Sequence, residues 1–292
     1  MLNTAAMKQT LLKPSYHFIK NQVVYGTMLY HYGVARQRLL LKKINRSQCH
    51  TYTCFYRSPG QLSALTGPVM DYLLAGRMPG KFQINLFAAS KGAEPYTIAS
   101  MLIKNFPNLD FHISASDLHQ EMIDRAREAV YTANEVLNEF VTDQFIADTF
   151  VKTGDRYQVR PEIRARVSFQ QANLLDPKLS EKLEPADLIF AQNVFFHLDQ
   201  PMAREAFRKV LMLLKPKSAL FIDGMELDMR EELTTEAGLL PLDFMTQEIH
   251  EAARKHVGDH WWNYYYGMEP YVGWRPNHLR RFSTVFFKGK SI

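Results

Sequence analysis

Cysteine is scarce in this chain of 292 residues, which contains only Cys49 and Cys54. Two thiols are too few for a disulfide framework, and so low a count fits a reducing compartment; we therefore predict a cytoplasmic protein. The sequence has no run of about 18 apolar residues, the length that a membrane-spanning helix needs. Its first residues also lack the basic, apolar and small-residue order of a secretory signal. These absences argue against a disulfide-rich secreted domain and against a membrane span.

Acidic residues are missing from the beginning of the chain. None precedes Asp71, whereas nine lysines and arginines do, and the rest of the chain holds more acids than bases. A patch of one sign attracts partners of the opposite sign, which makes an acidic protein one candidate partner. The same stretch also fits a solvated helical face or an organelle transit peptide. Nucleic-acid binding would rest on this arm alone, because no RRM, KH or helix-turn-helix signature appears.

Apolar runs and amphipathic segments alternate from Lys81 onward. Strands are predicted at 83–89, 111–115, 167–171, 187–192, 219–223 and 282–288, and helices at 94–105, 120–131 and 202–214. Helices are also predicted before this region, at 23–41 and 62–74. Such alternation predicts an α/β fold, with a mostly parallel sheet between helices on both faces. We divide the chain into an N-terminal basic helical segment, 1–79, and a domain, 80–292, with a β-hairpin insertion at about 149–169 around Gly154.

Two acidic residues stand where such a sheet binds ligands, at the carboxyl ends of its strands. Glu94 begins the helix after the first strand, in a turn whose single glycine, Gly92, excludes a G-x-G-x-x-G dinucleotide loop. It is either a simple helix cap or a carboxylate that faces a nucleoside. Asp117 ends the second strand, where it either binds the hydroxyls of a ribose or caps the next helix.

Six pieces of the sequence share their order and spacing with one enzyme family. The pieces are T-C-F-Y-R at 53–57, A-A-S-K-G-A-E-P-Y-T-I-A-S at 88–100, S-A-S-D at 114–117 with Ala126, Arg127 and Tyr131 after it, N-L-L at 173–175, D-L-I-F-A-Q-N-V at 187–194 and L-L-K-P at 213–216. Together they cover roughly residues 50–226. The chain resembles the CheR-type methyltransferases, which methylate glutamates of chemotaxis receptors with S-adenosylmethionine.

The resemblance implies a class I, Rossmann-like methyltransferase fold with S-adenosylmethionine as methyl donor. Arg57 would reach the sulfonium or the methionine carboxylate, Asp117 the ribose, and Leu174 the adenine. The full set of implied donor-binding residues is Thr51, Thr53, Arg57, Ser90, Gly92, Glu94, Asp117, Asn173, Leu174, Ala191, Gln192 and Asn193. Arg57 is also an implied catalytic residue, and no metal ion is expected.

The chain departs from the family pattern mainly on the acceptor side. Ala93 replaces the first glutamate of G-E-E-P-Y, Gln192 replaces an arginine, His197 replaces a tyrosine and Thr51 replaces an asparagine. The acceptor therefore stays open between a carboxylate of a protein and a small molecule. His197 is a candidate catalytic base for a hydroxyl or amine acceptor, or a histidine that merely packs.

Other interpretations of the chain follow from some of these departures and from other features of the sequence. The losses at Ala93 and Gln192 suggest a regulatory module that binds the donor and has lost transfer activity, and the basic arm suggests a nucleic-acid-associated protein. The aromatic residues at 261–266 either pack at a core edge or line an acceptor pocket. Arg275, Arg280 and Arg281 are interpreted as ordinary surface charges.

Overall fold

The structure is a computed structural model that describes residues 53–255 and 267–289. Thr51, the predicted helix at 23–41 and the aromatic residues at 261–266 lie outside the described residues. Within the described part of the chain, every helix is too short or too polar to cross a membrane.

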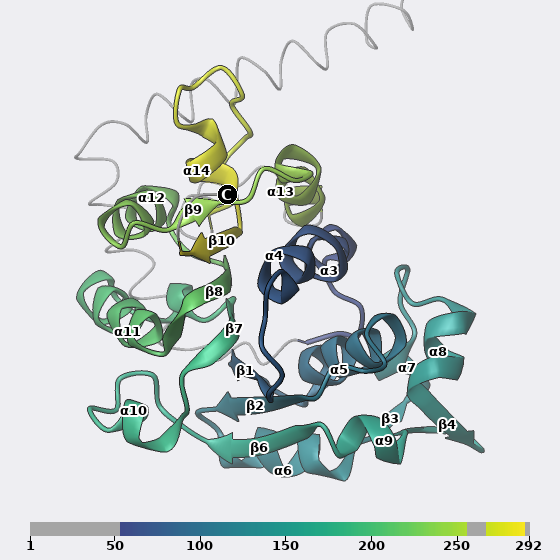
Figure 1. The fold of residues 1–292 in the computed structure, drawn as a ribbon. Helices are drawn as coiled ribbons and strands as arrows, with labels where there is room; N and C mark the ends of the chain where they lie inside the picture. Colours follow the sequence, from purple (N-terminus) through teal and green to yellow (C-terminus); the bar gives the residue numbers. More distant parts are fainter. Residues whose placement is uncertain (1–52, 256–266, 290–292) are drawn as a thin grey trace, which may run out of the picture.

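In the described chain, seven strands form one central sheet (Figure 1). In spatial order they are β6 (Val167–Gln171), β2 (Phe111–Asp117), β1 (Phe82–Phe87), β7 (Ala186–Gln192), β8 (Leu214–Asp223), β10 (Val285–Lys288) and β9 (Leu240–Pro241). The strands from β6 to β8 are parallel, whereas β10 runs antiparallel to both of its neighbours. The predicted α/β fold with a mostly parallel sheet is confirmed.

Helices cover both faces of this sheet (Figure 1). Leu188 and Phe190 of β7 face the core on the side of α5 (Ala93–Asn105), whereas Ile189 and Ala191 face the core on the side of α11 (Gln200–Met212). Successive side chains of a strand point to opposite faces. The central strands β1 and β7 are therefore buried along their whole length and mostly apolar, which is why short apolar runs predicted them.

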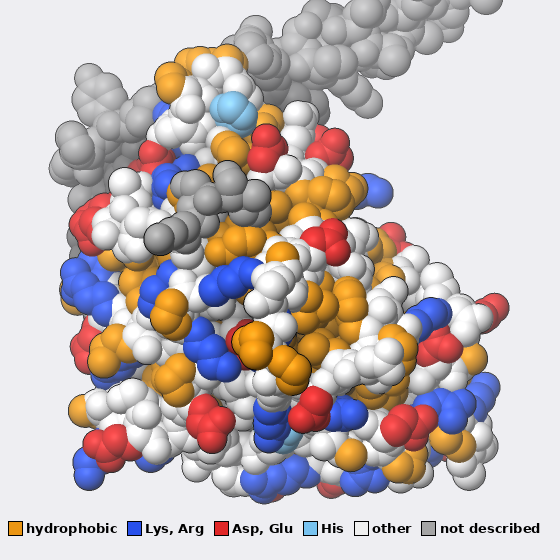
Figure 2. Space-filling view, in the orientation of Figure 1, with side chains coloured by type: hydrophobic (Ala, Val, Ile, Leu, Met, Phe, Trp, Pro, Cys, Tyr) orange, Lys and Arg blue, Asp and Glu red, His pale blue; other side chains and the backbone are white. Residues whose placement is uncertain are grey.

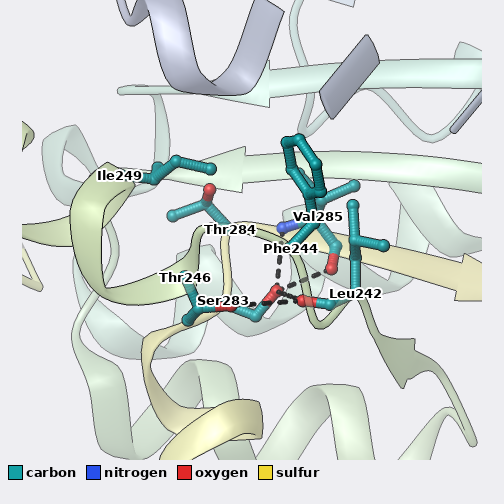
Figure 3. Close-up of a pocket in the computed structure, with 7 residues that line it drawn as sticks. All are labelled: Leu242, Phe244, Thr246, Ile249, Ser283, Thr284 and Val285. Atoms are coloured by element: carbon teal, nitrogen blue, oxygen red, sulfur yellow. Dashed lines mark hydrogen bonds between the residues drawn. The ribbon is translucent and has the colours of Figure 1, made fainter. Parts of the chain in front are cut away.

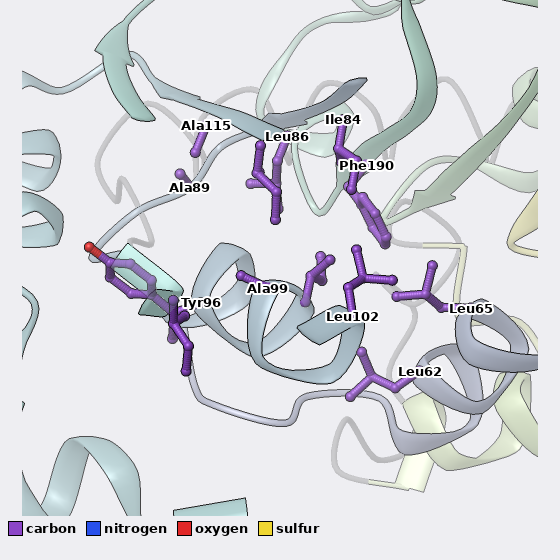
Figure 4. Packing of buried hydrophobic residues seen from close by; sticks show 14 of the residues in the cluster. Leu62, Leu65, Ile84, Leu86, Ala89, Tyr96, Ala99, Leu102, Ala115 and Phe190 are labelled. Atoms are coloured by element: carbon purple, nitrogen blue, oxygen red, sulfur yellow. The ribbon is translucent and has the colours of Figure 1, made fainter. Parts of the chain in front are cut away.

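The α5 side carries much of the larger core. Ile84 and Leu86 of β1 point toward Ala99 and Leu102 of α5, and all four side chains are fully buried (Figure 4). Burying a leucine or isoleucine side chain contributes roughly 1.5–3 kcal/mol. This packing fixes α5 under β1 and so places the N-terminus of α5 at the carboxyl edge of the sheet.

The segment before β1 packs into the same core. It consists of α3 (Pro59–Ala64), a π-helical turn η1 (Leu65–Val69) and α4 (Met70–Leu74). The predicted continuous helix at 62–74 is interrupted at Gly67, whose backbone is non-helical, and Pro68 follows it inside η1. Leu62 and Leu65 lie beside α5 (Figure 4). The division of the chain at residue 79 stays a prediction.

A second, three-stranded antiparallel sheet contains the predicted insertion. Its strands are β3 (Val130–Thr132), β5 (Arg156–Val159) and β4 (Phe150–Thr153), with Gly154 in the hairpin turn. The hairpin ends at Val159, earlier than predicted, because α9 (Pro161–Arg164) precedes β6. The helix predicted at 120–131 is also shorter: α6 (Gln120–Glu128) ends before Ala129, whose left-handed backbone (φ 56°) breaks the helix, and Tyr131 lies in β3.

The remaining elements connect these layers. They are α7 (Ala133–Val136), α8 (Asp143–Thr149), α10 (Leu179–Lys182), η2 (Phe195–His197), α12 (Leu227–Glu236), α13 (Thr246–Lys255) and α14 (His278–Phe282). Arg281 of α14 corrects one prediction, because it is 3% exposed and pairs with the buried Glu269 at 2.7 Å and with Asp228 at 2.6 Å. A buried guanidinium needs such carboxylate partners.

Asp187, the second residue of β7, joins several elements at the amino end of the sheet. Its carboxylate accepts the backbone N–H of Gln83 at 2.9 Å and pairs with Lys215 at 2.7 Å and with Arg77. Burial of the Asp187 carboxyl opposes its ionisation, but the bonds from Lys215, Arg77 and Gln83 outweigh burial and lower its pKa. The ionised carboxylate therefore stabilises the folded chain.

We expect Asp187→Asn to lower the free energy of unfolding by about 2 kcal/mol, since it leaves two partly buried cations without their partner. Because the folded pKa lies below the unfolded one, this contribution is present above the unfolded pKa and is lost as the pH falls. Urea unfolding at neutral pH and at pH 3 measures both effects. Glu232→Gln, which breaks the exposed pair with Arg204 at 2.6 Å, serves as the control and should change stability little. An equal loss in both variants would contradict the account.

Candidate active site

The loop after β1 brings its backbone to the end of β2. Ala88 and Ser90 have positive φ angles of 57° and 47°, and Gly92 has φ 89°. The N–H of Ser90 donates to Oδ2 of Asp117 at 2.8 Å. A Cβ atom at position 92 would lie 3.0 Å from Cβ of Ala126, so a glycine suits both the backbone angle and the close packing there. The predicted residues Ser90, Gly92 and Asp117 therefore belong to one cluster.

Asp117 is held by two backbone groups. Besides the N–H of Ser90, its carboxylate accepts the N–H of His119 at 2.9 Å, and the residue is 8% exposed. An ionised carboxylate offers about four acceptor positions, so about two remain for a ligand diol. The fixed carboxylate at the end of β2 therefore suits a ribose.

Glu94, at the start of α5, is a partly buried residue whose carboxyl group lies below the surface. Burial raises the pKa of Glu94 to about 7, and the positive charge of Arg57 partly opposes this rise. Arg57 itself is exposed. The structure therefore brings these two predicted residues within electrostatic reach of each other, although they lie in different parts of the sequence.

Two leucines and an asparagine follow the ends of β2 and β6. Leu174 is 8% exposed, and Asn173 is exposed and accepts the N–H of Leu175 with its side chain at 2.9 Å. Leu118, directly after Asp117, exposes 54% of its surface. An exposed leucine beside this carboxylate offers an apolar surface that suits a flat aromatic ring. Leu118 was not among the predicted site residues, although its position directly after Asp117 was a usable signal.

The chain after β7 turns sharply beside the end of β8. Asn193 has φ 53°, and its N–H donates to the backbone oxygen of Asp223 at 3.0 Å. Ala191 is fully buried and Gln192 is 9% exposed. Asp223, which the sequence reasoning also missed, ends β8, is 7% exposed and accepts the N–H of Gly224 at 2.7 Å. The ends of β7 and β8 thus form a second cluster of predicted positions.

Two further predicted residues lie in the described part of the chain. His197 is exposed in η2, with its ring centroid 4.0 Å from that of Phe196. Thr53 is partly buried at the start of the described chain. Their roles stay predictions.

A small crevice lies elsewhere, between α13 and the start of β10 (Figure 3). Its lining consists of Leu242, Phe244, Thr246, Ile249, Ser283, Thr284 and Val285. None of these is a predicted site residue. Gln61 donates to the hydroxyl of Thr284 at 2.8 Å, so the crevice is tied to α3.

The sheet order, the carboxylate at the end of β2 and the turn before α5 define a Rossmann-like, class I methyltransferase architecture. Residues 51–237 match the family described as CheR methyltransferase, SAM binding domain. The match covers more than half of the chain, and the chain belongs to the CheR methyltransferase family. It confirms the predicted CheR-type family and a domain of the kind that binds S-adenosylmethionine, the predicted donor.

Three relatives illustrate the similarity. A chemotaxis protein methyltransferase of Listeria monocytogenes is 27% identical over 228 residues, which is 77% of this chain and 84% of the relative. Chemotaxis protein methyltransferase 2 of Vibrio cholerae is 30% identical over 178 residues, or 60% and 61%. The probable biofilm formation methyltransferase WspC of Pseudomonas aeruginosa is 28% identical over 203 residues, or 69% and 48%. The matched part of the chain thus spans about half the length of WspC.

Proposed function

We propose that this chain transfers the methyl group of S-adenosylmethionine to a carboxylate of an acidic protein partner. S-adenosylmethionine supplies a methyl carbon that its sulfonium makes electrophilic. A carboxylate oxygen forms the new O–C bond, the S–C bond breaks with its electron pair moving to sulfur, and the products are a methyl ester and S-adenosylhomocysteine. The reaction needs no proton transfer, because a carboxylate is already ionised at neutral pH.

The observation that carries this proposal is that Arg57 lies within electrostatic reach of Glu94, at the start of α5. Arg57 offers a positive charge to an incoming acceptor carboxylate. Holding the reacting atoms in line provides most of the rate enhancement over the uncatalysed reaction, since effective molarities of about 10⁵–10⁸ M are possible for aligned groups.

The donor fits the residues around this pair. Asp117 would accept the ribose hydroxyls, Leu118 and Leu174 would pack on the adenine, and Glu94 would face the donor's methionine ammonium. Ser90 and Gly92 would let the loop backbone approach the nucleoside. Asn173, Ala191, Gln192 and Asn193 would close the pocket, and Thr53 would line it near Arg57.

The partner and the location remain part of the proposal. Several relatives carry the name chemotaxis protein methyltransferase, which supports a protein as the acceptor. On the face that Figure 2 shows, basic and acidic side chains of the described residues are intermixed. The cytoplasmic location rests on the low cysteine content.

A methyl-labelling experiment tests the acceptor class. Purified chain is incubated with S-adenosylmethionine carrying a tritiated methyl group and with protein extract from the organism that encodes it. We expect labelled protein that releases volatile methanol in mild base, because esters hydrolyse whereas N-methyl groups do not. Label stable to base would instead favour an amine acceptor with His197 as the base. Donor binding with no label in any acceptor would favour the inactive regulatory module.

A further inference from the structure

The backbone on both sides of Arg57 adopts a conformation that ordinary side chains disfavour. Tyr56 and Ser58 both have φ 58°, in the left-handed region. Residues other than glycine occupy this region at a cost, and they remain there only where their surroundings hold them. The position of Arg57 therefore depends on whatever fixes residues 55–58.

One anchor is Thr97 on α5. The N–H of Tyr56 donates to Oγ1 of Thr97 at 3.2 Å, and the Thr97 hydroxyl donates to the backbone oxygen of Ala93 at 2.8 Å. Thr97 is 2% exposed. Its hydroxyl links the segment that carries Arg57 to the same helical turn that carries Glu94.

A second anchor is Asn138, which follows α7. Nδ2 of Asn138 donates to the backbone oxygen of Phe55 at 2.9 Å, while Oδ1 accepts the N–H of Phe140 at 2.9 Å. Both ends of the amide are thus used, which fixes its orientation.

Aromatic packing completes the attachment. Phe55 is fully buried and meets Tyr131 of β3 edge-to-face at a centroid distance of 4.8 Å and Phe150 of β4 at 5.0 Å. Tyr131 also donates its hydroxyl to the backbone oxygen of Lys91 at 2.6 Å, in the loop after β1. The small sheet therefore contacts both the segment before Arg57 and the loop that holds Asp117.

We propose that Thr97 and Asn138 are positioning residues that hold Arg57 over the donor pocket by binding the backbone on its amino-terminal side. This inference rests on the proposed function, which places Arg57 beside the donor. It assigns the small sheet and the α7–α8 connection a part in building the donor site, through contacts that involve no ligand.

Isothermal titration with S-adenosylhomocysteine tests this proposal, since it needs no acceptor. Thr97→Val removes the hydroxyl at nearly constant volume, Thr97→Ser restores it, and Asn138→Asp keeps the bond from Phe140 while losing the donor to Phe55. We expect Thr97→Val and Asn138→Asp each to weaken binding about threefold to tenfold, and Thr97→Ser to retain nearly full affinity. Asn105→Ala, which removes a similar side-chain bond to Met101 at the far end of α5, is the matched control and should bind normally.

A double-mutant cycle with Arg57→Ala separates positioning from a general structural role. If the anchors act through Arg57, adding Asn138→Asp or Thr97→Val to Arg57→Ala changes the affinity by less than about twofold. Full additivity, or wild-type affinity in both single variants, would overturn the inference while leaving the proposed function intact. Absence of binding by the wild-type chain would instead refute the proposed function. Thermal unfolding without ligand, on every variant, confirms that each is folded.

Discussion

Asp117→Ala is expected to weaken the binding of S-adenosylmethionine by at least about 100-fold. Hydrogen bonds to a charged group contribute roughly 1.5–3 kcal/mol each, and each 1.4 kcal/mol is about tenfold in affinity, so losing the bonds to two ribose hydroxyls accounts for this effect. The variant also releases the N–H groups of Ser90 and His119, which loosens the loop after β1. Titration calorimetry on the folded variant measures the change.

One further variant tests the charge of the Asp117 carboxylate, and a second serves as a control. Asp117→Asn keeps one acceptor oxygen and loses the charge, so we expect an intermediate loss. Asp110→Ala removes an exposed carboxylate just before the opposite end of β2, where it pairs with Arg166 at 2.9 Å, and donor affinity should not change. Unchanged affinity in a folded Asp117→Ala variant would remove Asp117 from the donor site.

Glu94 is expected to make donor binding depend on pH. With its pKa raised to about 7, this carboxyl is partly protonated near neutral pH in the free chain. The ammonium of the donor's methionine part favours the ionised form, so we expect affinity to rise about tenfold between pH 6 and pH 8. Binding at pH 7 should release protons, which calorimetry in buffers of different ionisation enthalpy detects. In Glu94→Gln the affinity should be weaker and nearly independent of pH.

The same group affects stability in a defined direction. Its folded pKa lies above the unfolded value of 4.5, so the folded chain binds more protons between these values. The free energy of unfolding therefore falls as the pH rises from about 4.5 through about 7, and Glu94→Gln should reduce this dependence. A wild-type affinity that falls between pH 6 and pH 8 would contradict the assigned role of Glu94.

The central strands could be predicted because the signal for each one lies in the composition of its own few residues. A run such as Leu188–Phe190 is buried on both faces, so its apolar composition alone indicates a central strand. Asp117 and Glu94 were predicted because one ends a strand and the other begins a helix, at the edge where ligands of such sheets bind. The match to the CheR family then fixed the identity of the donor.

Other features could not be predicted because they depend on contacts between distant parts of the chain. The helix at 120–131 ends early because Ala129 takes a left-handed backbone and Tyr131 is buried in β3, against Phe55. Arg281 has the sequence context of a surface residue and becomes buried because Glu269 reaches it. The bond between Asn138 and Phe55 joins residues whose spacing forms no motif.

A crystal structure of the chain with S-adenosylhomocysteine tests the central claim most directly. We predict the ribose hydroxyls within hydrogen-bonding distance of the Asp117 carboxylate, the adenine against Leu118, and the sulfur near Arg57. A nucleoside bound away from the ends of β1 and β2, with Asp117 contacting only Ser90 and His119, would contradict it.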